Sequence, residues 1–172
     1  LPTASNDNTN KTDLFYKRFE ILDLNVSHFD LISSVNGFEN WLSNLDAVYI
    51  GGGNTKFKLE FWKENNLIGI FKEIYNSGTV LSGVSAGAAC WFDCFLTDSD
   101  GPGYKPLNGI GLLSGSFTPH YSDSKRAEKY RENIKNKTLP EGIGVDDGVA
   151  VLFIDGNPTE VYSSRKGHNA YF

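Results

Sequence analysis

A serine between two glycines is the strongest chemical signal in this chain. Gly83-Val84-Ser85-Ala86-Gly87 follows the apolar run 79–81, and the residues from Ala86 onward can begin a helix. This strand–turn–helix context is what a G-x-S-x-G nucleophile elbow requires. Side chains on the neighbours of so sharp a turn would collide with the strand and the helix. The turn would aim Ser85 Oγ and the N–H of Ala86 at a reacting carbonyl, whereas the alternative is an ordinary small-residue turn.

A serine hydroxyl needs a base, and His120 is the best candidate among three histidines. It follows the run 116–119, which predicts a short strand ending at Pro119. His120 would therefore project at the carboxyl edge of the sheet, where open α/β folds place their sites. His28 lies among apolar residues and His168 in a polar terminal stretch, so we expect a structural and a solvated role for them.

A carboxylate should accept the second N–H of the imidazole. Between Ser85 and His120 the acidic candidates are Asp93, Asp98 and Asp100. Asp93 would lie two turns along the helix after Ser85, which is a poor position. Asp98 and Asp100 fall in the loop that follows, and spacing alone does not choose between them.

A glycine loop follows the apolar strand expected at 47–50. The backbone N–H groups of Gly51-Gly52-Gly53-Asn54-Thr55 could complete an oxyanion hole or cradle a phosphate. The phosphate interpretation is the weaker one, because neither G-x-x-x-x-G-K-[ST] nor G-x-G-x-x-G is present. A tight turn with Asn54 or Thr55 as a helix cap is the structural alternative, and it is compatible with the oxyanion role.

Buried strands alternate with helices along the chain, which predicts an α/β fold with a largely parallel sheet. The expected elements, in order, are a loop at 1–12, a helix at 13–19, strand 20–24, helix 38–44, strand 47–50, helices within 59–74 broken near 65–66, strand 79–81, a helix from 86, a loop-rich region at 98–120, helix 125–136 and a β-hairpin of 149–153 with 159–162. The chain contains no Met and opens on Leu1-Pro2, so we expect its true N-terminus and first strand to be missing.

Composition narrows the class of protein. With 172 residues, of which 40% are hydrophobic, residues 1–172 should form a single domain with a full core. Sixteen Lys+Arg against 21 Asp+Glu give a net charge of −5, which argues against nucleic acid or an anionic membrane as partner. No stretch approaches the ~18 apolar residues that span a bilayer. Cys90 and Cys94 suit a reducing, cytoplasmic compartment, and we take them as core thiols rather than a metal site.

Three motifs in the same order resemble the peptidase E (aspartyl dipeptidase) and cyanophycinase family of serine peptidases. They are Gly51–Thr55, Gly83–Ala88 and Pro119-His120-Tyr121, and the segment 145–150 is similar to a late strand-and-turn segment of the family. The resemblance covers roughly residues 47–153. It implies the fold of class I glutamine amidotransferases, a flavodoxin-like three-layer sandwich with a mostly parallel central sheet.

The resemblance also implies roles for individual residues. Ser85 would attack a peptide carbonyl and His120 would act as general base. The N–H groups of Gly52 or Gly53 and of Ala86 would supply the oxyanion hole. We expect Asn54 to contact the substrate.

The acid that completes the site varies within the family, being Asp in some members and Glu in others. Counting from Ser85 without gaps places it at Asp100. Relatives with a helix like Cys90-Trp91-Phe92 carry Thr-Asp-Ser, which matches Thr97-Asp98-Ser99 and favours Asp98.

These observations predict a cytoplasmic serine exopeptidase that hydrolyses short peptides through an acyl-enzyme. We expect no cofactor, no nucleic-acid or membrane partner, and consider a homodimer. The alternatives are an inactive amidotransferase-like regulatory module and a flavodoxin-like domain that binds a nucleotide or another small ligand.

Overall fold

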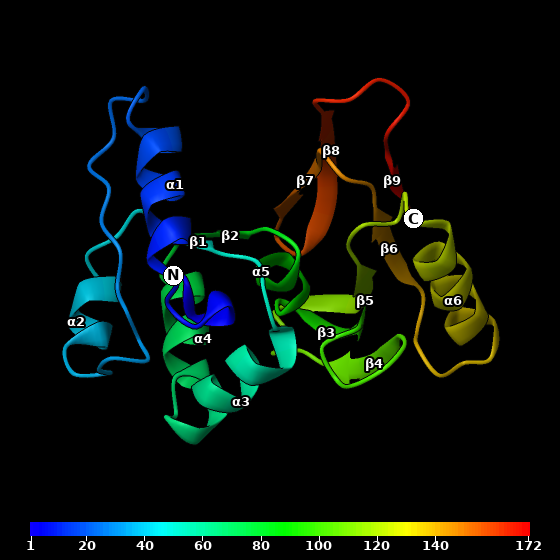
Figure 1. Ribbon diagram of the computed structural model, residues 1–172, viewed down its shortest axis with the longest axis horizontal. Helices are drawn as coiled ribbons and strands as arrows, with labels where there is room; N and C mark the ends of the chain where they lie inside the picture. The colour runs from blue at the N-terminus through cyan, green and yellow to red at the C-terminus, as the bar shows by residue number, and fades with distance from the viewer. The chain divides into compact units, whose positions relative to one another are not determined.

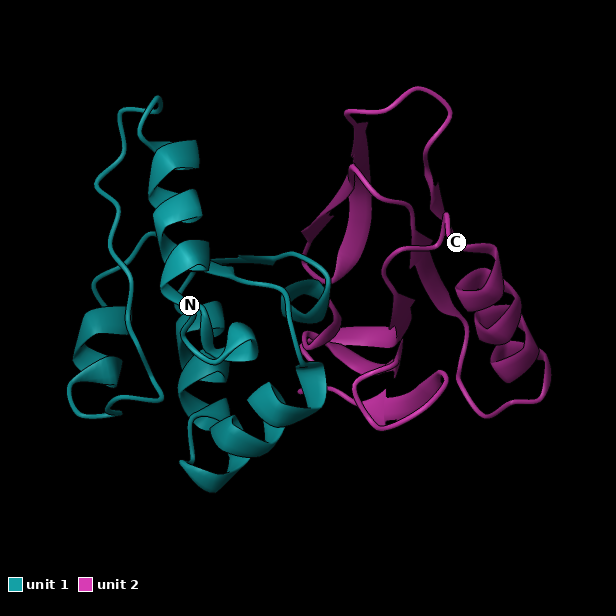
Figure 2. Cartoon of the chain, in the orientation of Figure 1, with its two compact units in different colours: residues 1–88 teal, residues 89–172 magenta.

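The computed structural model describes residues 1–172, and the chain divides into two compact units (Figure 2). Unit 1 is Leu1–Ala88 and unit 2 is Ala89–Phe172. The fold is mixed α/β with a mostly parallel central sheet, as the sequence predicts. The expectation of one domain over 1–172 stays a prediction.

Figure 1 shows the elements in chain order. Unit 1 contains η1 (Thr3–Ser5), α1 (Thr9–Phe19), α2 (Phe38–Leu42), β1 (Ala47–Ile50), α3 (Thr55–Glu64), α4 (Ile68–Asn76) and β2 (Val80–Gly83), and α5 (Ala86–Ala89) follows at the boundary. Unit 2 contains β3 (Phe92–Thr97), β4 (Lys105–Asn108), β5 (Leu113–Thr118), α6 (Ser124–Lys135), β6 (Gly142–Val145), β7 (Val149–Ile154), β8 (Asn157–Ser163) and β9 (Ala170–Tyr171).

In unit 1 the two strands β1 and β2 pair in parallel and end together, since Ile50 lies opposite Gly83. The glycine loop after β1 and the elbow after β2 therefore leave the sheet at the same edge. Helices α3 and α4 pack against each other through Trp62 and Phe71, whose ring centroids are 4.3 Å apart. Both side chains are fully buried.

Unit 2 is built on a five-stranded sheet of order β4-β3-β5-β6-β9. The three inner strands β3, β5 and β6 are parallel, and β4 and β9 are antiparallel edge strands. Strands β7 and β8 form a separate antiparallel hairpin. Because the inner strands are parallel and adjacent, the residues that follow β3, β5 and β6 gather at one edge.

Several sequence predictions are confirmed. Strand β1 has the predicted bounds, the break between α3 and α4 falls at residues 65–67, and β5 ends before Pro119. Helix α6 and the β7–β8 hairpin lie where the pattern places them.

Two element predictions are wrong. Residues 20–24 form no strand, and Ile21, Leu22 and Leu24 are exposed. The helix expected from Ala86 ends at Ala89, and β3 begins at Phe92. In addition, α1 begins at Thr9, inside the expected loop, because the Asn8 side chain accepts the N–H of the residue two positions on and caps the helix.

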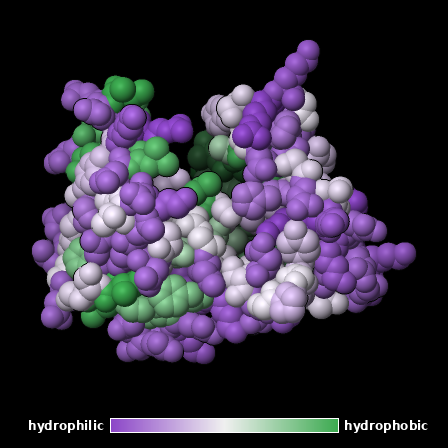
Figure 3. Space-filling view, viewed as in Figure 1, coloured by the Kyte–Doolittle hydropathy of each residue, from purple (hydrophilic) through white to green (hydrophobic).

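The exposed segment 20–24 follows the last turn of α1. In Figure 3 hydrophilic residues cover most of the visible face, and hydrophobic residues appear in separate groups, one of them at the upper left, where Figure 1 shows α1. No helix combines the length and the apolar character that crossing a bilayer demands.

The N-terminal residue lies beside β1, since the Gly51 N–H donates a hydrogen bond to Leu1 O at 3.0 Å. The expectation that a first strand is missing stays a prediction.

Candidate active site

Ser85 occupies a strained turn between β2 and α5. Its φ is +52°, in the left-handed region that a non-glycine residue rarely adopts. A Cβ at Gly83 would lie 2.2 Å from the carbonyl oxygen of Gly87, and a Cβ at Gly87 would lie 2.0 Å from that of Ile50. The Gly87 N–H donates to Val84 O at 2.8 Å and closes the turn. Both flanking positions therefore have room only for glycine, for the reason expected from the sequence.

The glycine loop lies against this elbow within unit 1. A Cβ at Gly52 would be 3.3 Å from Val84 O and 3.4 Å from Ser85 Cβ. Gly53 has a φ of +150°, and a Cβ there would meet main-chain atoms at 2.1 Å. Asn54 caps α3, since its Oδ1 accepts the N–H three residues on at 2.9 Å. The loop thus brings bare backbone next to the serine while its last side chain holds the helix.

His120 lies at the carboxyl end of β5, as predicted. Its φ of +55° is also left-handed. Two main-chain hydrogen bonds hold this turn: the Tyr121 N–H donates to Val145 O at 3.0 Å, and the Asp123 N–H donates to His120 O at 2.9 Å. The chain therefore turns at His120 itself, and strain of this kind persists only where surrounding contacts fix it.

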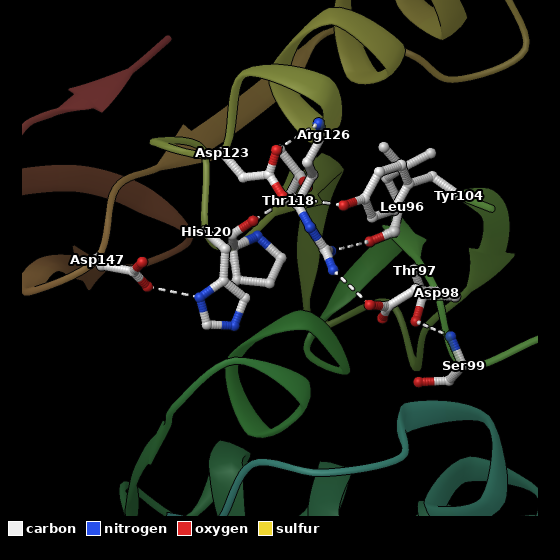
Figure 4. A network of polar contacts seen from close by, with 11 residues as sticks. Leu96, Thr97, Asp98, Ser99, Tyr104, Thr118, His120, Asp123, Arg126 and Asp147 are labelled. Carbon is white, nitrogen blue, oxygen red and sulfur yellow. Dashed lines mark hydrogen bonds and ion pairs between the residues drawn. The ribbon is translucent and has the colours of Figure 1, made fainter.

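The carboxylate partner of His120 is Asp147, which follows β6 (Figure 4). Nδ1 of His120 is 2.5 Å from Asp147 Oδ1. This hydrogen bond, with a weaker contribution from Ser122, holds the pKa of the Asp147 carboxyl below its usual value. An ionised carboxylate only accepts, so Nδ1 carries the proton and the neutral ring has its lone pair on Nε2.

The two acids suggested by the sequence form ion pairs with basic residues. Asp98 follows β3, and its Oδ2 is 3.1 Å from Nη2 of the buried Arg126 (Figure 4). The Asp100 carboxylate is 3.9 Å from Lys105 Nζ. Asp98 therefore lies just after β3, the strand paired with β5, and its carboxylate forms an ion pair with Arg126.

Sequence reasoning does not identify Asp147, because the acids that it considers lie between Ser85 and His120, whereas Asp147 follows the histidine. The available signal was the pair Asp146-Asp147 directly after the run 142–145. The side chains of Asp146 and Asp147 have different partners. Asp146 is buried and accepts the Asn169 N–H at 3.0 Å, whereas Asp147 reaches His120.

Glycines in β6 make room for the residue that follows the histidine. A Cβ at Gly144 would lie 2.5 Å from the ring of Tyr121, and a Cβ at Gly142 would lie 1.9 Å from Ser116 O. Tyr121 also packs on Tyr171, with ring centroids 5.0 Å apart. The turn at His120 is thus supported by ring packing that requires bare backbone in the next strand.

Comparison with known proteins decides the family. Residues 1–161 match the model of Peptidase family S51. The chain belongs to peptidase family S51. It is 42% identical to the uncharacterized peptidase YgaJ of Bacillus subtilis (strain 168), over 99% of this chain and 75% of YgaJ. It is 30% identical to Peptidase E of Haemophilus influenzae (strain ATCC 51907 / DSM 11121 / KW20 / Rd), over 76% of this chain and 62% of that protein.

Two solved structures share the fold of this S51 chain. A Listeria monocytogenes EGD-e protein, provisionally assigned as a peptidase E, aligns with a TM-score of 0.67 at 20% identity, over 95% of this chain and 83% of that one. A peptidase from an acI-B1 Actinobacterium aligns with a TM-score of 0.64 at 18% identity, over 87% of this chain and 66% of that one. The predicted resemblance to peptidase E is confirmed, and the chain is a member of a family of peptidases.

Proposed function

We propose that this S51 chain is a serine exopeptidase of the peptidase E type that hydrolyses short peptides. Ser85 Oγ attacks the carbonyl carbon of the scissile peptide bond while its proton passes to Nε2 of His120. The proton then moves to the leaving amine as the C–N bond breaks, which leaves an acyl-enzyme. Water, deprotonated by the same nitrogen, attacks the ester carbonyl. The bond from this carbon to Ser85 Oγ then breaks as the proton returns from His120 to Oγ, which releases the acid product.

The observation that carries this proposal is the backbone of Ser85. A left-handed φ on a serine between two glycines without room for a Cβ is the strained arrangement that a nucleophile elbow requires. The hydrogen bond from His120 to Asp147 supports the assignment of the base, since it fixes the ring tautomer that can take the proton. Membership of a peptidase family supports the chemistry that links these residues.

The oxyanion that forms in the attack would be held by backbone N–H groups. We assign this role to Ala86 and to Gly52 or Gly53, because the glycine loop lies in contact range of Ser85. Asn54 follows that loop, and we retain it as a substrate contact in addition to its role as helix cap.

We assign the chain to the flavodoxin-like sandwich of the class I glutamine amidotransferases. It would act in the cytoplasm, without a cofactor, on peptides alone, and a homodimer is the assembly to test first.

Intact mass after reaction with a fluorophosphonate tests the mechanism. We expect one adduct on the wild-type chain, mapped to Ser85 by peptide mass spectrometry. Ser85→Ala should give no adduct, and His120→Ala should slow labelling by at least about 1000-fold because the base is lost. A folded wild-type chain that takes no label would overturn the proposal and favour an inactive module.

Dipeptide hydrolysis then tests the substrate class. A panel of dipeptides and N-blocked dipeptides should separate exopeptidase activity, which needs a free terminus, from cleavage that tolerates the block. Equal background hydrolysis by wild type and Ser85→Ala would contradict a role in short-peptide hydrolysis.

A further inference from the structure

Lys58 is a charged side chain buried inside unit 1 that the proposed mechanism does not use. It lies in the first turn of α3, and none of its side chain is exposed. Burial of an ammonium group is costly in free energy unless polar partners replace the lost water. The free-energy cost of burying Lys58 therefore calls for a structural or functional explanation.

The side chain of Lys58 ends at the nucleophile elbow. Its Nζ donates a hydrogen bond of 2.8 Å to the carbonyl oxygen of Ala86, the residue after Ser85. The same Nζ lies 4.7 Å from the ring centroid of Trp62, one turn along α3, so the aliphatic stem runs beside a buried indole. The ammonium group is thus held on one side by a ring and on the other by the backbone of the elbow.

This contact joins the two segments from which we derive the oxyanion hole. Helix α3 begins directly after the glycine loop and is capped by Asn54, whereas Ala86 belongs to the elbow after β2. Lys58 therefore connects the element that carries Gly52 and Gly53 to the peptide unit next to the N–H of Ala86.

Resting on the proposed function, we infer that Lys58 is a positioning residue, which sets the spacing between the two oxyanion donors. Oxyanion donors act only when they lie about 2.7–3.1 Å from the developing charge. A misplacement of about 1 Å can cost roughly 100-fold in rate. Lys58 fixes the Ala86 carbonyl, and through that residue the direction of its N–H, relative to the glycine loop.

The test compares Lys58→Met with Lys63→Met. Met nearly matches the length of lysine but provides no N–H and no charge. Lys63 lies in the last turn of the same helix with its side chain exposed, so the same change there controls for altered helix composition. The readouts are the second-order rate of fluorophosphonate labelling at Ser85 and the melting temperature of each unlabelled variant.

We expect Lys58→Met to be labelled about 10- to 100-fold more slowly than wild type. Its melting temperature should fall by no more than about 3 °C or should rise, because an apolar side chain replaces a buried charge. Lys63→Met should match wild type in both measurements. Slow labelling without a loss of stability is a result that a purely structural lysine would not give.

Labelling of Lys58→Met at the wild-type rate overturns this inference and leaves the proposed function intact. A wild-type chain that takes no label overturns the proposed function itself. If Lys58→Met melts below the assay temperature, Lys58→Gln decides the question. Its amide nitrogen is one bond nearer the backbone than the ammonium, so the inference still expects slowed labelling, and a wild-type rate refutes it.

Discussion

Replacing Asp147 by Asn gives the sharpest test of the residues gathered at the edge of the unit 2 sheet. The carboxylate accepts the Nδ1–H of His120 at 2.5 Å and stabilises the imidazolium that forms when Nε2 takes the serine proton. Asparagine keeps the shape of the side chain but removes the charge, and its NH₂ group can select the wrong ring tautomer.

The size of the effect follows from charge and exposure. Opposite unit charges about 4 Å apart interact by ~4 kcal/mol at an effective dielectric constant of about 20, and by ~1 kcal/mol in water. The side chains of His120 and Asp147 are 42% and 44% exposed, so solvent screening favours a value of ~2 kcal/mol. With a tenfold change in rate per ~1.4 kcal/mol, Asp147→Asn should slow reaction at Ser85 by about 30-fold or more.

The assay is fluorophosphonate labelling followed by intact mass, with Asp98→Asn and Asp100→Asn as matched controls. Asp98 pairs with Arg126 and Asp100 with Lys105, so we expect both controls to label within about threefold of wild type. Asp147→Asn at the wild-type rate, together with a slow Asp98→Asn or Asp100→Asn, would refute this reasoning and restore the acid suggested by the sequence motifs.

Three further predictions concern packing and titration. Gly87→Ala should lower the melting temperature by roughly 5–10 °C in thermal unfolding, because its Cβ would lie 2.0 Å from Ile50 O. Gly69→Ala in α4 is its control: with no atom within 4 Å, that change should leave stability equal or higher, and equal behaviour of both variants would contradict the packing argument. Burial raises the pKa of Tyr130 to about 12, so stability that is complete below pH ~10 should be lost as the pH rises through about 12, by ~2–3 kcal/mol. Urea unfolding should show this loss in wild type and not in Tyr130→Phe. Burial also raises the pKa of the Cys94 thiol, so at pH 8 iodoacetamide should alkylate it at less than about a tenth of its rate in the urea-unfolded chain, as peptide mass spectrometry would show. Equal rates would mean that the thiol is accessible and ionised.

The elbow was predictable from sequence because its signal is local. Five consecutive residues around Ser85 indicate the turn, and the lack of room at Gly83 arises within this segment, from the carbonyl oxygen of Gly87. The distant residue Ile50 limits the room only at Gly87. The placement of His120 was predictable for a similar reason, since a strand that ends at a proline fixes which edge of the sheet the next residue meets.

The partner of the histidine was not predictable from spacing. Asp147 lies 27 positions after His120, and only the parallel pairing of β5 with β6 brings the two residues together. The helix expected beyond Ala89 failed for a related reason, because a short apolar run fits a buried strand and a buried helix equally well. The segment 20–24 has the composition of a strand, but a strand also needs a neighbour to pair with, which no sequence pattern supplies.

The glycines of β6 have a consequence for experiments that map function by mutation. Gly142 and Gly144 touch no reactant, yet added Cβ atoms there would meet the main chain of β5 at 1.9 Å and the ring of Tyr121 at 2.5 Å. In a saturation screen scored by activity, both positions should therefore be as intolerant as the nucleophile. A readout of protein abundance alongside activity would separate them, because substitutions at Ser85 should leave the amount of folded protein unchanged while those in β6 should reduce it.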